Sequence, residues 1–190
     1  ASIFQSEAYP LLTYTDGGTV RQRRDFTKEE DKCITVHKLE ENHLEEILET
    51  LLAHGGVAGI IVNTVGRAQV LFERLMNVFG TDVTLLHAKF IDTDRVAKEK
   101  VLMDNIGKGA KRPRRAIVIG TQVLEQSLDI DFDVLVTDLC PMDLLLQRVG
   151  RLHRHQISRP KGFATPVLYV MGQSDVLTFE KGASAIYGDY

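Results

Sequence analysis

The chain has 190 residues, of which 44% are hydrophobic and 26% are charged. This length and composition are typical of one soluble globular domain with a well-filled core. The net charge of −3, from 23 basic and 26 acidic residues, excludes a protein that is uniformly positive. A local basic groove remains possible, because nucleic-acid binding depends on where the charge lies.

The two cysteines, Cys33 and Cys140, lie far apart in the sequence. They fit neither a zinc-ligand spacing nor a disulfide framework, so we expect no metal ligands and a reducing, cytoplasmic location. No hydrophobic run approaches the ~18 residues that a membrane span needs, and the N-terminus lacks a signal-peptide pattern. A membrane partner is therefore not expected.

The first 32 residues differ from the rest of the chain. Thr15-Asp16-Gly17-Gly18 is a turn signal between short β-prone segments, which favours a hairpin. Residues 21–32 (RQRRDFTKEEDK) are highly charged and are expected to be solvated. We therefore expect a hairpin or linker at 1–32, one domain at 33–171 and an exit segment at 172–190.

From residue 33 onward, strand-like and helix-like segments alternate. Hydrophobic runs predict strands, and the run at 57–62 (VAGIIV) is typical of a strand buried on both faces. Leucines at helical spacing predict helices between the strands. The predicted strands are 34–39, 57–62, 83–86, 134–137, one from Ala116 to the turn at Gly120 and a possible last one at 167–170. The predicted helices are 40–54, 65–79, 92–105 and one that carries Gln147. This alternation predicts an α/β fold with a mainly parallel sheet and helices on both faces.

Polar residues directly follow four of the predicted strands: Asn63-Thr64, His87, Gly120-Thr121 and Asp138. Ligands of such folds bind beyond the carboxyl ends of the strands. We therefore expect these residues to line one rim of the sheet.

The segment 147–154 (QRVGRLHR) carries three arginines. If it is helical, Arg148, Arg151 and Arg154 form one stripe, because they are spaced by three residues. Guanidinium groups fork onto phosphate oxygens, so this stripe suits a polyphosphate. Gly150 would then let another backbone approach closely. The alternative is a solvated basic helix face.

Three further features allow a functional and a structural interpretation. Gly120-Thr121 could hold a phosphate and Asp129 a ribose hydroxyl, or Asp129 could cap a turn. His87 and Lys89 could contact phosphate or base, or form a polar strand end. The loop 108–115 (KGAKRPRR) could follow a nucleic-acid backbone, but a solvated connection is the commoner role of such a loop.

Several nucleotide-binding patterns are absent from the sequence. It contains no G-x-x-x-x-G-K-[ST] phosphate loop, no Asp-Glu pair after a hydrophobic strand to hold magnesium and no G-x-G-x-x-G. The chain thus has arginines for a nucleotide but no motif that would bind one alone.

Together these segments resemble a known family. Residues 120–129 (GTQVLEQSLD) are similar to motif five of superfamily-two helicases, and 147–154 to their motif six, Q-R-x-G-R-x-x-R. Residues 61–64 are similar to motif four, and 86–90 to the DNA-contacting segment that follows. With 139–148 (LCPMDLLLQR) and 150–155 (GRLHRH), the combination resembles the CRISPR-associated helicase-nuclease of type I systems, over about residues 34–170.

The resemblance implies the second RecA-like domain of a two-domain motor. In that family the first domain mainly holds ATP with Mg²⁺, and the second supplies arginine fingers. The matching positions here are Arg151 and Arg154. Gln147 would face the γ-phosphate and the attacking water, and Asp129 would face the ribose or a coupling network. Arg148 would either contact the nucleotide or pair internally.

The resemblance also implies that Thr64, His87 and Thr121, with Lys89 beside them, contact the backbone of a single DNA strand. The full-length family protein unwinds and degrades foreign DNA after recruitment by an RNA-guided surveillance complex, and its nuclease is a separate N-terminal domain. The sequence matches neither that nuclease nor the first motor domain, so we expect the isolated chain to be inactive. Two alternatives remain: a nucleic-acid-binding module without an ATPase role, and a superfamily-two motor that acts on RNA or chromatin.

Overall fold

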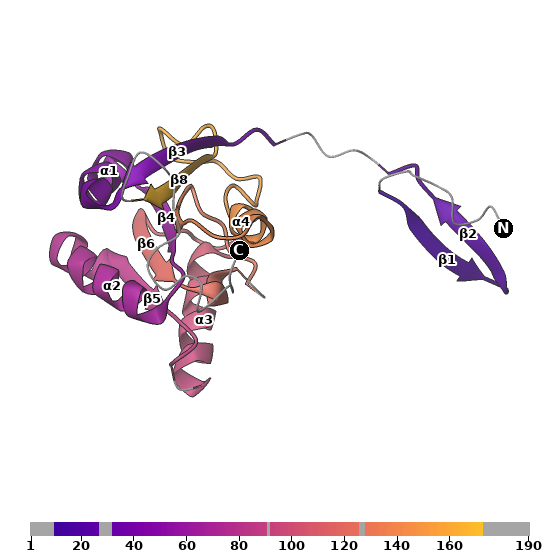
Figure 1. The fold of residues 1–190 in the computed structure, drawn as a ribbon, viewed down its shortest axis with the longest axis horizontal. Helices are drawn as coiled ribbons and strands as arrows, with labels where there is room; N and C mark the ends of the chain where they lie inside the picture. The colour runs from indigo at the N-terminus through magenta and orange to yellow at the C-terminus, as the bar shows by residue number, and fades with distance from the viewer. Residues whose placement is uncertain (1–9, 27–31, 91, 126–127, 173–190) are drawn as a thin grey trace. The chain divides into compact units, whose positions relative to one another are not determined.

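The computed structural model describes residues 10–26, 32–90, 92–125 and 128–172 (Figure 1). The chain divides into two compact units, Ala1–Lys32 and Cys33–Tyr190. Of the expected exit segment 172–190, only the first residue belongs to the described ranges.

The described part of the first unit is a two-stranded antiparallel hairpin, as predicted. Strand β1 (Leu12–Asp16) pairs with β2 (Thr19–Arg23), and Asp16 lies opposite Thr19. The connecting residues Gly17 and Gly18 have φ angles of 55° and 81°, which a tight hairpin turn needs and glycine adopts without strain. Residues 27–31 of the charged segment lie outside the described ranges.

The second unit is built on a six-stranded sheet in which all neighbouring strands are parallel. The strand order is β3-β8-β7-β4-β6-β5. The strands are β3 (Thr35–Glu40), β4 (Gly56–Ile61), β5 (Val83–Leu86), β6 (Arg115–Gly120), β7 (Val134–Asp138) and β8 (Val167–Gly172). The α-helices are α1 (Leu44–Leu51), α2 (Val65–Phe79), α3 (Asp92–Ile106) and α4 (Met142–Val149). Short 3₁₀ turns are η1 (Glu41–His43), η2 (Leu52–His54), η3 (Gly80–Asp82) and η4 (Gln122–Leu124). The predicted α/β architecture is confirmed.

Alternation of side chains along the strands creates two hydrophobic cores, one on each face of the sheet. In β4, Ala58 and Ile60 face a core that α1 and α2 cover, whereas Val57 and Ile61 face a core that includes residues of α3 and α4. All six residues of β4 are buried, which explains why its sequence is continuously hydrophobic. The domain therefore has three layers, with helices on both faces of the sheet.

A glycine in the centre of the sheet makes room for a large side chain. A Cβ atom at Gly59 would lie 2.6 Å from the ring of Phe132, which packs over β4 and is fully buried. Phe132 belongs to residues 129–133, the segment that leads into β7. This close contact holds the segment against the sheet, and there the segment forms hydrogen bonds with the residues that follow α4.

Candidate functional site

The polar residues expected at one rim do come together there. Because the strands are parallel, β4, β5, β6 and β7 end at the same edge of the sheet. The Asn63 N–H donates to the Asp138 carboxylate at 3.0 Å, and the side chain of Gln122 donates to the Asn63 carbonyl at 3.1 Å. The Asp138 carboxylate also pairs with Arg67, so this aspartate has the structural role that is usual for a lone acid at a strand end.

Gly120 has a steric reason to be glycine. A Cβ atom at this position would lie 2.5 Å from the Leu86 carbonyl oxygen and 2.6 Å from Leu124. The turn after β6 can therefore pack tightly between β5 and η4. This turn carries Thr121 and leads to Glu125. Residues 126–127 of the motif-five segment lie outside the described ranges.

The prediction that one helical stripe carries Arg148, Arg151 and Arg154 is wrong. Helix α4 ends at Val149, so only Arg148 of the three is helical. The prediction that Gly150 admits another backbone is also wrong, since the nearest atoms to a Cβ there are carbonyl oxygens of the preceding helical turn. The arginines differ in environment: Arg148 is buried, Arg151 is half-buried and Arg154 is exposed.

The chain leaves the helix because residues 151–153 pair with the segment before β7. The Phe132 N–H donates to the Arg151 carbonyl at 2.9 Å, and the His153 N–H donates to the Phe132 carbonyl at 3.0 Å. Leu152 between them is fully buried. His153 has a φ of 48°, a left-handed conformation that is uncommon outside glycine and asparagine, and it redirects the chain toward Arg154.

Arg148 pairs inside the domain, which was one of the two roles considered for it. Its Nε donates to a carboxylate oxygen of Glu125 at 2.7 Å, and both side chains are fully buried. Its terminal nitrogens donate to Thr137 at 2.7 Å and to the Asn63 side chain at 3.0 Å. The guanidinium thus ties η4 and α4 to the ends of β4 and β7, and it lies out of reach of a ligand in this conformation.

Arg151 is held by neutral oxygens. One terminal nitrogen donates to the Glu125 carbonyl at 2.7 Å, and Nε donates to the Leu124 carbonyl at 3.4 Å. Burial lowers the pKa of the guanidinium below its usual value. Within the described ranges no carboxylate lies within 4.0 Å of it, so its charge is not neutralised by an ion pair. This charge is therefore available to an anion.

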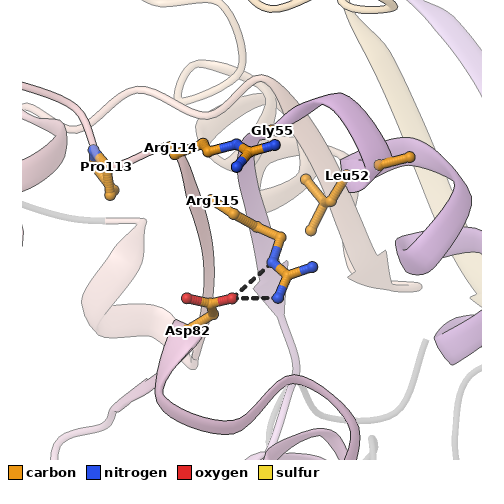
Figure 2. Close-up of a pocket in the computed structure, with 7 residues that line it drawn as sticks. Leu52, Gly55, Asp82, Pro113, Arg114 and Arg115 are labelled. Carbon is orange, nitrogen blue, oxygen red and sulfur yellow. Dashed lines mark hydrogen bonds and ion pairs between the residues drawn. The ribbon is translucent and has the colours of Figure 1, made fainter.

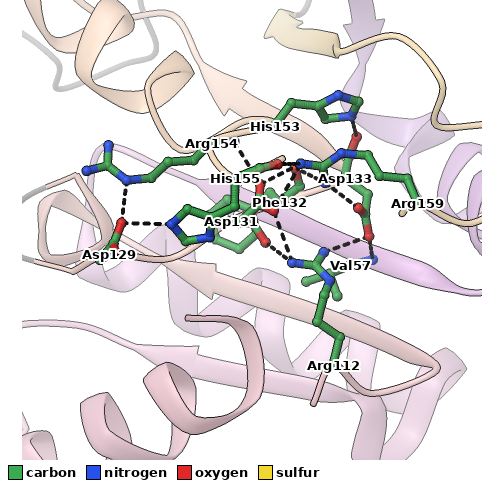
Figure 3. Close-up of polar contacts among 10 residues, drawn as sticks. All are labelled: Val57, Arg112, Asp129, Asp131, Phe132, Asp133, His153, Arg154, His155 and Arg159. Atoms are coloured by element: carbon green, nitrogen blue, oxygen red, sulfur yellow. Dashed lines mark hydrogen bonds and ion pairs between the residues drawn. The ribbon is translucent and has the colours of Figure 1, made fainter. Parts of the chain in front are cut away.

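Arg154, in contrast, is paired with Asp129. Its Nε lies 2.5 Å from a carboxylate oxygen of Asp129, and His155 contacts the same oxygen at 3.0 Å (Figure 3). The hydrogen bond from Arg154 and then that from His155 hold the pKa of the Asp129 carboxyl below its usual value. Two residues expected to contact nucleotide, Asp129 and Arg154, thus contact one another.

An aspartate–arginine cluster, which the sequence analysis missed, supports this region (Figure 3). Asp131 and Asp133 are fully buried, and each pairs with Arg112 and Arg159. Asp131 also accepts the Arg154 N–H at 2.8 Å, so the cluster fixes the backbone next to the paired Asp129. The alternation of acids with Ile and Phe in residues 129–133 (DIDFD) indicates an extended segment with one solvated face, whereas Asp131 and Asp133 are buried, so this pattern did not reveal the cluster.

The four residues expected to contact DNA differ in accessibility. Lys89 is exposed and Thr64 is half-buried, whereas His87 and Thr121 are 4% and 1% exposed. The Thr64 hydroxyl accepts the Arg67 N–H at 3.2 Å and so caps the start of α2. Thr121 begins η4.

His87 organises the loop that presents Lys89. Its Nδ1 accepts the Lys89 N–H at 3.2 Å, and its ring stacks on Phe90 with centroids 4.1 Å apart. Burial, with a smaller contribution from Lys89 and Lys98, lowers the pKa of His87 below 6.5. The folded state therefore binds this proton less tightly than the unfolded chain. The stability that depends on neutral His87 is fully present above pH 6.5 and decreases below it.

The basic loop at 108–115 is partly occupied by contacts within the domain. Arg112 pairs with the buried aspartates, and Arg115 pairs with Asp82 at 2.6 Å (Figure 2). The loop borders a cavity of about 440 Å³ at the amino ends of β4 and β6, away from the rim. The lining residues are Leu52, Ala53, Gly55, Asp82, Pro113, Arg114 and Arg115. These contacts favour the structural interpretation of the loop.

The remaining expectations concern Gln147, metals and membranes. Gln147 is exposed on the last turn of α4. In the part of the chain that the structure describes, no three His, Cys, Asp or Glu side chains gather into a possible metal site. None of the helices within those ranges has both the length and the hydrophobicity needed to cross a bilayer.

Comparison with protein families and sequences shows what this chain is similar to. The family described as "CRISPR-associated nuclease/helicase Cas3, C-terminal" matches residues 54–157. The "CRISPR-associated nuclease/helicase Cas3" of Streptococcus thermophilus is 53% identical over 185 residues, which are 97% of this chain and 20% of that protein. The chain thus spans about one fifth of the length of this relative.

Solved structures agree with these matches. The crystal structure of T. fusca Cas3-AMPPNP has a TM-score of 0.80 and 30% identity, over 96% of this chain and 24% of that one. A chain of a "CRISPR RNA-guided surveillance complex, pre-nicking" has a TM-score of 0.77 and 28% identity, over 95% of this chain and 24% of that one. The predicted RecA-like fold is confirmed.

Proposed function

Since the chain belongs to the family of the C-terminal region of the CRISPR-associated nuclease/helicase Cas3, we propose that it is the second motor domain of an ATP-dependent single-strand DNA translocase. In the full-length protein this motor would unwind foreign DNA, and a nuclease in another domain would degrade it. Its partners would be single-stranded DNA, the first RecA-like domain of the same polypeptide and an RNA-guided surveillance complex. The full-length protein would act in the cytoplasm, where it would encounter foreign DNA.

The observation that carries this proposal is the state of Arg151. Its guanidinium is partly desolvated, is held only by the carbonyls of Leu124 and Glu125, and has no carboxylate counter-ion in the described ranges. A cation in this state suits the charge that develops on a transferring phosphoryl group. Arg151 is thus the main arginine finger, and Arg154 joins it when a nucleotide competes for Asp129.

The other nucleotide contacts follow from their positions. Exposed Gln147, on the last turn of α4, lies four residues before Arg151 and would orient the attacking water. Asp129 would exchange its bond with Arg154 for a ribose hydroxyl, or would serve in coupling. Arg148 acts from inside the domain. ATP with Mg²⁺ would be held mainly by the first motor domain, because this sequence contains no phosphate loop.

The rim of the sheet would contact the DNA backbone. Lys89 and Thr64 are accessible there and would bind phosphate directly. His87 would hold the Lys89 loop in place, and Thr121 would support the turn after β6. The positions of these residues along the rim support a path in which a single DNA strand crosses the carboxyl ends of β4, β6 and β5.

The direct test is ATP hydrolysis with and without single-stranded DNA. The full-length protein is expected to hydrolyse ATP when single-stranded DNA is present, and the 190-residue chain alone is expected to show no turnover and only weak DNA binding. The rival binding module predicts appreciable, salt-dependent binding by the chain alone, which is lost when the basic residues of the loop 108–115 are neutralised. A motor for RNA or chromatin would instead lack DNA nuclease activity in the full-length protein.

The roles proposed for Lys89 and His87 predict different effects on the salt dependence of DNA binding. Replacing Lys89 with glutamine in the full-length protein should reduce the magnitude of the slope of log K against log salt for single-stranded DNA by about 0.7, because one phosphate contact is lost. His87→Gln should leave the slope unchanged at pH 7.5, since burial keeps His87 neutral at that pH. Fluorescence anisotropy at several salt concentrations measures both slopes. Lys111→Gln, in the basic loop, is the control, and a larger effect there than at Lys89 would favour the rival module.

A further inference from the structure

We infer that Glu125 is a positioning residue that couples the proposed nucleotide contacts to the proposed DNA-contacting rim. The inference deepens the proposed function and rests on it. Glu125 directly follows η4, in the turn between the rim residue Thr121 and the segment that leads to Asp129. Only 2% of the residue is exposed, so it touches neither ligand and acts through its neighbours.

The side chain of Glu125 connects the turn after β6, through Arg148, to the ends of β4 and β7. One carboxylate oxygen accepts the Nε of Arg148 at 2.7 Å, and both side chains are fully buried. Arg148 in turn donates to Thr137, at the end of β7, and to Asn63, which follows β4 and precedes Thr64. The Glu125 carboxylate therefore sets the position of a cation that holds the rim together.

The backbone of the same residue holds the proposed arginine finger. The Glu125 carbonyl accepts a terminal nitrogen of Arg151 at 2.7 Å. One N–H of that nitrogen is held by this carbonyl, so the position of Glu125 sets the direction of the remaining N–H groups of the guanidinium. Because one residue binds Arg151 by its backbone and Arg148 by its side chain, movement of the finger is transmitted to the rim. The same connection lets a change at the rim shift the finger.

The second carboxylate oxygen of Glu125 gives the turn a possible second arrangement. It is buried, and it has no hydrogen-bond partner in the described ranges. A buried acceptor without a partner is unfavourable and is stabilised by any donor that approaches it. A shift of η4 or α4 that brings a donor to this oxygen would be stabilised, and it would move the turn whose carbonyl holds Arg151. Coupling between two sites needs such an element with two arrangements.

The test is the thermodynamic coupling between the two ligands. The dissociation constant of full-length protein for single-stranded DNA is measured with and without saturating AMPPNP. The wild-type ratio is expected to be about tenfold, within the range usual for coupled sites, and AMPPNP affinity must change by the same factor when DNA is added. Glu125→Gln removes the charge that anchors Arg148, and it should bring the ratio to within about twofold of one.

Asp133→Asn is the matched control. It makes the same change from acid to amide at another buried carboxylate, which pairs with two arginines and lies outside the turn after β6. We expect it to lower the thermal midpoint and to keep the wild-type ratio, whereas a merely structural Glu125 would behave in the same way as Asp133. A wild-type ratio in Glu125→Gln overturns the inference.

A second variant covers the case in which Glu125→Gln does not fold. The double variant Glu125→Gln, Arg148→Gln contains no unpaired buried charge at this site, and its ratio should still be close to one. If the double variant keeps the wild-type ratio, the inference is overturned. A wild-type protein that binds neither single-stranded DNA nor AMPPNP overturns the proposed function itself. This result is distinct from one in which the wild-type protein couples the two ligands and the Glu125 variants keep that coupling.

Discussion

Replacing Arg151 with alanine in the full-length protein is expected to lower DNA-stimulated ATP hydrolysis by about 10³-fold or more, the usual contribution of an arginine finger. Arg151 is the proposed finger whose charge has no carboxylate partner in the described ranges, so its removal takes away stabilisation of the transferring phosphoryl group. The fold should survive, because Arg151 donates only to two backbone carbonyls. Steady-state kinetics should show the loss mainly in kcat.

Three further variants make this prediction specific. Arg151→Lys should recover little activity, since an ammonium group lacks the planar fork of guanidinium. Arg154→Ala should also lower turnover strongly. Arg114→Ala removes an exposed arginine at the opposite edge of the sheet and should stay within about twofold of wild type. Near-normal turnover in both Arg151→Ala and Arg154→Ala would contradict the finger assignment.

Replacing Asp133 with alanine is expected to cost about 3–5 kcal/mol of the free energy of unfolding, because it removes one of the two buried aspartates that balance the charges of Arg112 and Arg159. The Asp133 carboxylate contacts Arg112 at 2.8 Å and Arg159 at 2.6 Å, and it accepts the Val57 N–H at 2.8 Å. The substitution thus also leaves the Val57 N–H, near the start of the central strand β4, without this hydrogen-bond acceptor. Urea denaturation of the 190-residue chain, followed by circular dichroism, measures the loss.

Asp82→Ala is the matched comparison. Asp82 also pairs with an arginine at 2.6 Å, but 32% of its side chain and 42% of that of Arg115 are exposed. Water solvates both charges when such a pair is broken, so the expected cost is about 0–1 kcal/mol. Equal costs for the two substitutions would show that burial of the aspartate cluster contributes nothing to stability.

Much of the fold was predictable from local patterns. Strand β4 was visible as a continuous hydrophobic run, since a strand buried on both faces has no polar positions. Helix α2 was predicted with the bounds observed, 65–79, because Thr64 caps its start and Gly80, at a φ of 57°, ends it. The rim could be predicted as well, because parallel strands place their carboxyl ends at one edge.

The end of α4 shows where local patterns fail. The spacing of Arg148, Arg151 and Arg154 is compatible with a helix, and Gly150 retains a helical conformation. The helix nevertheless stops at Val149, because burial of Leu152 and pairing with Phe132 stabilise a turn that leads the chain out of the helix. Phe132 lies 20 positions away in the sequence, so no pattern within the segment reveals this competition.

The sequence by itself determined which elements form, at which edge their polar ends meet and which residue types are present for phosphate and DNA. Only the tertiary structure decided what each arginine does: Arg148 is buried against Glu125, Arg154 is paired with Asp129, and Arg151 is left without a counter-ion in the described ranges. The physical reason is that propensity and periodicity depend on near neighbours. Whether an arginine is buried, and whether it has a counter-ion, depends instead on partners 23 to 26 residues away in the sequence. Only folding brings these partners within 3 Å.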